Sequence, residues 1–190
     1  MSGHRRTFAV VVVTVCVMIG LAVAGGLAFI YSGVYDVSAS SKDNPLFAWA
    51  VHRTYEASLH RHASGIVVPA DLMSLDNIRA GARFYDSTCA VCHGAPDRAP
   101  SPIRQGIEPA APLLLSASRR NNPRLMFWTI KHGVNMTAMP SFGKTQSDAT
   151  IWQTAAFLFH ARGISASDYD ALTGRAGGGN DRGGDAKPAG

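Results

Sequence analysis

Cys89-Ala90-Val91-Cys92-His93 is the most informative stretch of this 190-residue sequence. It holds two thiols separated by two residues and followed at once by an imidazole, which is the C-x-x-C-H signature of covalent c-type haem attachment. In that chemistry the thiols add to the two vinyl groups of the porphyrin, and the same tether brings the histidine beneath the iron. The motif therefore predicts one haem c, bound through Cys89 and Cys92, with His93 as an axial ligand of its iron.

Other uses of a C-x-x-C pair are less favoured by the surrounding sequence. A thioredoxin-like redox pair needs a βαβ context, whereas residues 77–85, just before the motif, read as a helix. A structural zinc site needs a second pair of ligands, and no other cysteine occurs in residues 70–172. The third cysteine, Cys16, lies in an apolar run, so a disulfide framework is also excluded.

The iron needs a second axial ligand, and the best candidate is Met139. Pro140 and Gly143 break regular structure after it, so the ligand is expected in a loop that brings a thioether across the haem. Met136 is the competing thioether, and Met139 is preferred because Pro140 fixes the backbone just beyond it. His132 would give a bis-histidine haem of lower potential, but its place at the end of a predicted helix favours a structural role.

The N-terminal region contains a long apolar run, because no charged residue occurs from Phe8 to Tyr31. A helix of this length, at about 1.5 Å per residue, crosses a hydrocarbon core of roughly 30 Å. Arg5 and Arg6 precede the run, so the positive-inside bias predicts a cytoplasmic N-terminus and an exported C-terminal part. The alternative is a signal peptide cleaved near Ala22-Val23-Ala24, although the apolar residues beyond it favour an uncleaved anchor.

Composition divides the chain into four parts. Residues 1–34 are expected to form a cytoplasmic stub and a transmembrane anchor, and residues 35–69 a linker with a juxtamembrane helix over Pro45–Ala63. Residues 70–172 are expected to form the compact domain. Residues 173–190 are a Gly-rich tail, which buries too little surface to offset its ordering entropy and is predicted to be disordered.

Two sets of side chains stand out near the expected membrane. The aromatic residues that could lie at headgroup depth are Tyr31, Tyr35, Phe47 and Trp49. The histidines that could suggest a metal or second-haem site are His52, His60 and His62. Their spacing defines no site, so solvated surface histidines are the preferred interpretation.

With Cys89-x-x-Cys92-His93, Met139-Pro140-x-Phe142 and the helical segments around them, residues 70–172 resemble a class I cytochrome c domain. The resemblance covers just over half of the chain. It implies a mostly α fold, in which a single transmembrane helix precedes an all-α domain built around one covalent haem.

The resemblance further implies three main helices, over about residues 74–86, 123–134 and 148–162. Ser147 can cap the last of them. Gly81, in the first, is expected where the last helix packs closely, because an interior glycine costs about 1 kcal/mol against alanine. The side chains of the middle helix expected to face the haem are Leu125, Met126, Trp128 and Ile130.

By the same resemblance, Pro112 is the proline whose carbonyl accepts the proton on the other nitrogen of the histidine ligand, which fixes tautomer and ring orientation. Spacing alone does not choose between it and the neighbouring prolines, which are Pro100, Pro102 and Pro109. Several arginines could pair with haem propionates, form a docking face or simply be solvated: Arg104, Arg119, Arg120 and Arg124.

These features predict a monohaem electron carrier, tethered by a single pass to a bacterial inner membrane with its haem domain in the periplasm. His/Met ligation raises the reduction potential through the soft thioether, which suits a carrier rather than an enzyme. The expected partners are redox proteins, namely a dehydrogenase, a quinol-oxidising complex or a terminal oxidase. The formal charge of +5 is spread without a clustered basic face, so nucleic acid is not an expected partner. A chain that only carries electrons is also expected to transform no small-molecule substrate.

Two other functions remain open from the sequence. The chain could be the cytochrome subunit of a larger membrane-bound dehydrogenase or oxidase, with the helix over residues 45–63 as its docking element. It could also be a haem enzyme or gas sensor with an open iron position, against which Met139 argues.

Overall fold

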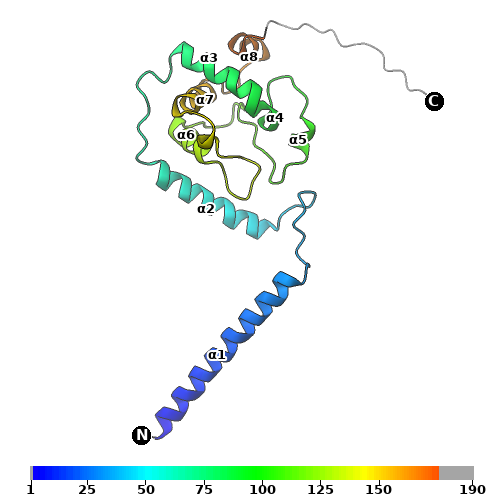
Figure 1. Cartoon of the computed structure of the whole chain (residues 1–190), viewed down its shortest axis with the longest axis vertical. Coiled ribbons are helices and arrows are strands. Elements are labelled where there is room, and N and C mark those ends of the chain that lie inside the picture. The colour runs from blue at the N-terminus through cyan, green and yellow to red at the C-terminus, as the bar shows by residue number, and fades with distance from the viewer. Residues whose placement is uncertain (1, 176–190) are drawn as a thin grey trace, which may run out of the picture. The chain divides into compact units, whose positions relative to one another are not determined.

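A computed structural model describes residues 2–175 of the chain, in which every regular element is helical (Figure 1). The mostly α fold class predicted from the sequence is confirmed. The chain divides into two compact units, one ending at Ser41 and one beginning at Lys42. Of the tail predicted to be disordered, residues 176–190 lie outside the described residues.

The first unit consists of helix α1, Ser2–Tyr31, and the residues that follow it. From Gly3 to Tyr31 its mean hydropathy of 2.7 and its length suit a membrane span, and no part of the span is buried. Thr14, in the middle of the apolar run, donates its hydroxyl proton to Val10 O at 2.9 Å, so the helix satisfies this polar group itself. A membrane anchor is consistent with all of these features, which an N-terminal signal sequence shares.

The second unit begins with helix α2, Pro45–Ala63, whose bounds agree with the prediction. Asn44 caps it, because its side-chain oxygen accepts from the first free backbone amides. The helix packs along α6, Pro123–His132, where Tyr55 Oη lies 3.2 Å from Thr129 Oγ1 (Figure 1). The helix expected in the linker therefore lies within the second compact unit.

Helices α3, Leu75–Phe84, and α7, Asp148–His160, pack against each other in this unit (Figure 1). A Cβ atom on Gly81 would lie 1.9 Å from Gln153 O, a distance that no side chain tolerates. The close packing predicted at Gly81 is confirmed. Ser147 accepts from the backbone of α7 as its N-cap, which was also predicted.

The core is formed by the facing sides of α3, α6 and α7. Together with Tyr85 and Tyr169 from neighbouring elements, the buried side chains of this core include Ile78, Ala82, Ile130, Ile151, Ala155, Phe157 and Leu158. Phe84 lies at the margin, where its ring meets that of Phe142 edge to face at 5.9 Å.

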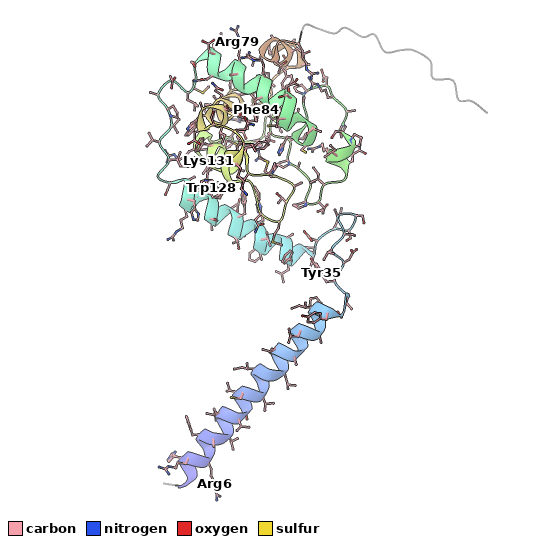
Figure 2. All side chains as sticks on the ribbon, in the orientation of Figure 1. Arg6, Tyr35, Arg79, Phe84, Trp128 and Lys131 are labelled. Atoms are coloured by element: carbon pink, nitrogen blue, oxygen red, sulfur yellow. The ribbon has the colours of Figure 1, made fainter. Side chains whose placement is uncertain are left out.

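The prediction for the inward face of α6 was partly wrong. Phe127 and Ile130 are buried, and the Phe127 ring stacks on Trp152 of α7 at 4.1 Å. Trp128, expected to face the haem, instead stacks on His62 of α2 at 5.8 Å (Figure 2). The reason is that α6 is covered on two sides, and consecutive helical positions point about 100° apart, so Trp128 meets α2 when Phe127 meets α7.

Two short helices were not predicted. One is α5, Pro102–Gln105, and the other is α8, Ala166–Thr173, which packs on α3. Ser165 caps α8 by accepting from Asp168 N, and Tyr169 buries its ring in the core. The only sequence signal for α8 was its capping serine, Ser165. The helix is too short for its apolar periodicity to distinguish it from a loop.

Candidate haem site

The C-x-x-C-H motif is positioned by a change of helical pitch. Helix α3 continues into one π-helical turn, Tyr85–Cys89, which leads directly into helix α4, Ala90–His93. The Ala90 amide donates to Tyr85 O five residues earlier, which is the wider spacing of a π turn. The helix predicted to end near residue 86 therefore continues as helical structure up to His93. The wider π turn changes the direction in which the side chains of the motif point relative to those of α3.

The two cysteines of the motif face the protein interior to different degrees. Cys89 is buried within the hydrophobic core, and Cys92 is half-buried. Burial, together with the neighbouring Cys92, raises the pKa of Cys89 to about 12. Its thiol is therefore neutral at physiological pH, in apolar surroundings that suit the edge of a porphyrin.

His93 is buried and oriented by one hydrogen bond. Its Nδ1 lies 2.9 Å from Pro112 O, and because a carbonyl can only accept, Nδ1 carries the proton and Nε2 keeps a free lone pair. Burial lowers the pKa of His93; the bond to Pro112 opposes this, and the charges of Arg104 and Arg119 add to the lowering. The imidazole is neutral, which is the form that binds a metal.

The chain after His93 folds back onto the motif. Gly94 ends α4 with a φ of 78°, and a Cβ there would lie 3.0 Å from the Leu113 side chain. Ser101 Oγ donates to Val91 O, and Arg104 Nη1 donates to Cys92 O at 2.5 Å. Carbonyls at the end of α4, which have no partner within the helix, are satisfied in this way.

Tyr85 connects the two ends of the haem motif region, a role that the sequence analysis missed. Its hydroxyl donates to Gly94 O at 2.7 Å, and its ring is completely buried. Burial raises the pKa of Tyr85 well above its ordinary value, so the hydroxyl remains a donor. The available signal was an aromatic residue one helical turn before Cys89, which by itself is also typical of ordinary core packing.

Asp86 gathers three partners around the π turn. Arg98 Nη1 lies 2.7 Å from its carboxylate, Tyr169 Oη donates to it at 2.9 Å, and Arg175 binds the second oxygen at 2.7 Å. Burial would raise the pKa of Asp86, but these hydrogen bonds and charges outweigh it and hold the pKa below its usual value. The cluster joins the π turn to the loop after the motif and to α8.

The loop that carries Met139 is attached to the end of α6. Val134 N donates to Met139 O at 3.1 Å, while Thr137 Oγ1 accepts from Met139 N at 3.1 Å and donates to Val134 O at 2.7 Å. Gly133, with a φ of 71°, lies so close that a Cβ would stand 2.8 Å from Met139 O and 2.7 Å from the Pro140 backbone. A glycine at 133 is what lets the loop return to α6.

Of the candidates for the second axial ligand, Met139 is the one packed against the interior. Its half-buried side chain contacts the hydrophobic core that includes Cys89. Met136 is 64% exposed, and His132 is exposed with its ring 4.9 Å from Trp128. These surroundings favour the Met139 thioether.

The three histidines of α2, His52, His60 and His62, are exposed. Within residues 2–175, no group of three or more His, Cys, Asp or Glu side chains is arranged to hold a metal ion. His62 instead bonds through Nδ1 to Ser58 O at 2.8 Å and stacks on Trp128.

The side chains present fit haem c. They offer two thiols, a neutral imidazole with a free nitrogen and a thioether, which is the donor set of a His/Met-ligated haem. In the described part of the chain, Arg119 Nε is also buried without a hydrogen-bond partner, and its charge reaches His93. A propionate carboxylate is an acceptor that would satisfy this donor. Arg104 and Arg124, by contrast, donate to the backbone oxygens of Cys92 and Ser64.

The all-helical fold and the C-x-x-C-H helix define a c-type cytochrome domain. Residues 76–158 match the family described as cytochrome c oxidase, cbb3-type, subunit III, and this part of the chain is a class I c-type cytochrome domain, a kind that binds haem c covalently. Comparisons with curated proteins and with solved structures found no match. The matched residues include the motif and Met139, whereas α2 and α8, which pack on them, lie outside the match.

Proposed function

We propose that this protein is a membrane-tethered cytochrome that carries single electrons between redox proteins on the periplasmic side of a bacterial inner membrane. That it is a haem-based electron carrier follows from its cytochrome c domain. The observation that carries the proposal is the buried His93, which follows the two cysteines directly and has its Nδ1 bonded to Pro112, so that Nε2 is left free.

Four side chains would hold the haem. Cys89 and Cys92 would bind it as thioethers, and His93 Nε2 and Met139 Sδ would be the axial ligands of the iron. When bound, haem c supplies a one-electron ferric/ferrous couple. The protein sets its properties, because the Pro112 carbonyl holds the imidazole in one orientation and the soft thioether favours the ferrous state, which raises the reduction potential.

The residues before the apolar span of α1 support the proposed location. Arg5 and Arg6 precede the span, and the positive-inside bias favours a cytoplasmic N-terminus and a periplasmic haem domain. Covalent haem attachment also suits that compartment. A tether keeps the domain at a high effective concentration near other membrane proteins, which are its expected donors and acceptors.

A second candidate function is supported by the name of the matched family. That family is described as a subunit of an oxidase, which favours the alternative in which this chain belongs to a larger membrane complex. Purification in mild detergent separates the two. A free haem protein supports the carrier, whereas stable co-purification of a catalytic subunit supports the complex.

The proposal is tested by producing the full chain in a host that matures c-type cytochromes. We expect a red protein whose mass includes one haem, and we expect Cys89→Ala with Cys92→Ala to abolish the covalent adduct. Cys16→Ser is the matched control, because this third cysteine lies in α1 and its loss should leave haem content unchanged. A colourless mature protein with unmodified thiols would overturn the proposal. Rapid binding of carbon monoxide to the ferrous wild type would indicate an open iron position instead.

A further inference from the structure

The first turns of α2 expose a group of large apolar side chains. Leu46, Phe47 and Trp49 are 72%, 42% and 58% exposed, respectively, although they belong to a well-formed helix. We call these three residues the α2 tip. A soluble surface rarely gathers such residues without a use, because each leaves apolar area in water.

The α2 tip is held in place by the rest of its own helix. The second half of α2 is anchored on the domain, where Leu59 and Ala63 are buried and His62 stacks on Trp128. The other end is fixed by Asn44, whose Oδ1 accepts from Leu46 N at 2.9 Å. The domain therefore presents the tip on a rigid helix rather than on a free strand of chain.

The chain also limits how far the α2 tip can lie from the apolar span. Residues 32–44 connect the end of α1 to the start of α2. Even fully extended, this segment reaches about 45 Å, and any bend shortens it. The length of this tether allows a tip that starts directly after it to reach the surface of the bilayer that α1 would cross.

The charges of α2 suit a lipid surface. The first acidic residue of the helix is Glu56, and the guanidinium of Arg53 pairs with it at 2.9 Å. Apolar and aromatic residues next to basic ones are typical of helices that lie at the membrane interface, where Trp is favoured because its ring is apolar and its N–H is polar.

We propose that Leu46, Phe47 and Trp49 insert into the boundary between headgroups and acyl chains of the bilayer that α1 spans. The haem domain then has two membrane contacts, the α1 tether and the α2 tip, which restrict the orientations in which it meets partners. This inference rests on the membrane anchor in the proposed function. It adds that lipid covers the exposed apolar side chains of the α2 tip.

The test uses the full haem-loaded chain in nanodiscs that contain neutral and anionic phospholipid, without any other protein. A nitroxide is placed at Leu46→Cys in a Cys16→Ser background. Collision rates with oxygen, which concentrates in lipid, are compared with those of a water-soluble nickel chelate. We expect the ratio of oxygen to nickel collisions to be several-fold higher at Leu46→Cys than at Ser167→Cys, an exposed site on α8.

Each other outcome has a distinct meaning. A ratio at Leu46→Cys equal to that at Ser167→Cys would place the tip in water, and low collision rates with both reagents would indicate contact with protein, such as a second copy; either result overturns the inference. A nitroxide on the native Cys16 reports separately on α1, so failure of the anchor itself is recognised.

A second variant checks that the three side chains act together. Adding Trp49→Glu to the Leu46→Cys background should lower the ratio several-fold, because a carboxylate resists insertion. The matched control adds Val67→Glu, another exposed apolar position outside the tip, and should leave the ratio unchanged. Haem content confirms that each variant is folded, and an unchanged ratio in Trp49→Glu would contradict insertion.

Discussion

The two candidate axial ligands are supported in very different ways. His93 ends a helix that is continuous with α3, and it is surrounded by bonds from Tyr85, Arg104 and Pro112 to the motif region. Met139 lies in a loop that returns to the end of α6, where Val134 N donates to Met139 O, Ser141 Oγ donates to Lys131 O at 2.8 Å, and the backbone approaches Gly133 closely. The histidine side thus continues a core helix, whereas the methionine side is a half-buried loop that packs on the core.

This comparison suggests that the two sides control different properties. Loss of support for His93 disturbs buried groups and should cost folding and haem retention. Loss of support for Met139 moves a loop and should mainly change the reduction potential. The predictions below test that division, starting with the largest expected effect.

The largest contrast should come from removing each ligand. We expect His93→Ala to form little of the covalent haem adduct, because it removes the ligand that would hold the iron beside the two thiols during attachment and leaves the Pro112 carbonyl without its donor. Met139→Ala should keep covalent haem but lower the reduction potential by on the order of 0.1 V, a part of the roughly 0.8 V that axial ligands span. Haem content and a potentiometric titration measure the two effects.

The control for this pair is Met136→Ala, because Met136 lies in the same loop but is mostly exposed. Its reduction potential should equal that of the wild type. If Met139→Ala also left the potential and the optical spectrum unchanged, Met139 would not be the ligand.

A smaller effect is expected from the glycine that positions the methionine loop. In Gly133→Ala, the methyl group would press against Met139 O and Pro140, and a positive φ costs an alanine about 1–2 kcal/mol. The loop should shift, so the weak long-wavelength absorption of methionine-ligated ferric haem should decrease while covalent haem is retained. Gly65→Ala is the matched control, since nothing lies within 4 Å of its added Cβ, and full retention of the band in Gly133→Ala would refute this role.

On the histidine side, Asp86→Asn should lower the free energy of unfolding by about 1–2 kcal/mol at neutral pH, because a nearly buried carboxylate loses its bonds from Arg98 and Arg175. The folded pKa of Asp86 is lowered, so its stabilisation is present above the unfolded value of about 3.9 and is lost as pH falls below it. Denaturant unfolding from pH 7 to pH 2 measures the difference.

The direction in which the stability difference changes with pH tests this role of Asp86. Wild type and Asp86→Asn should differ at neutral pH and converge in acid, whereas Asp71→Asn, at an exposed carboxylate, should behave as the wild type throughout. A difference that grew as the pH fell would show that Asp86 does not stabilise the fold as a carboxylate.

The smallest effect is expected from one hydroxyl. Tyr85→Phe removes the bond to Gly94 O, and we expect a loss of about 1 kcal/mol in the free energy of unfolding with the reduction potential nearly unchanged. Tyr55→Phe, which removes a half-buried hydroxyl on α2, should cost less. A Tyr85→Phe variant with a shifted potential but normal stability would reverse the proposed division between the two sides.

Local features could be predicted from the sequence because they depend on neighbouring residues. The motif Cys89–His93 is a run of five consecutive residues, so it can be recognised without knowing the fold. The predicted bounds of α2 agree with the structure because Asn44, Pro45 and the helical periodicity that follows them are neighbours in the chain. The apolar run of α1 is determined in the same way, by composition alone. Gly81 was also recognised, since an interior glycine indicates close packing.

Other features were decided only when distant segments packed. Spacing left four prolines as candidates, and the fold of the loop after His93 brings the Pro112 carbonyl to Nδ1. Trp128 turned toward α2 because that helix covers α6, which periodicity within α6 could not reveal. The hydrogen-bond partners of Asp86 come from positions 98, 169 and 175, so no local sequence pattern predicts these bonds. The sequence by itself determined which chemistry the chain carries, because the two thiols and the histidine ligand are adjacent residues of one motif. Only the tertiary structure decided how the haem ligands are oriented and supported, because those contacts join residues far apart in the chain.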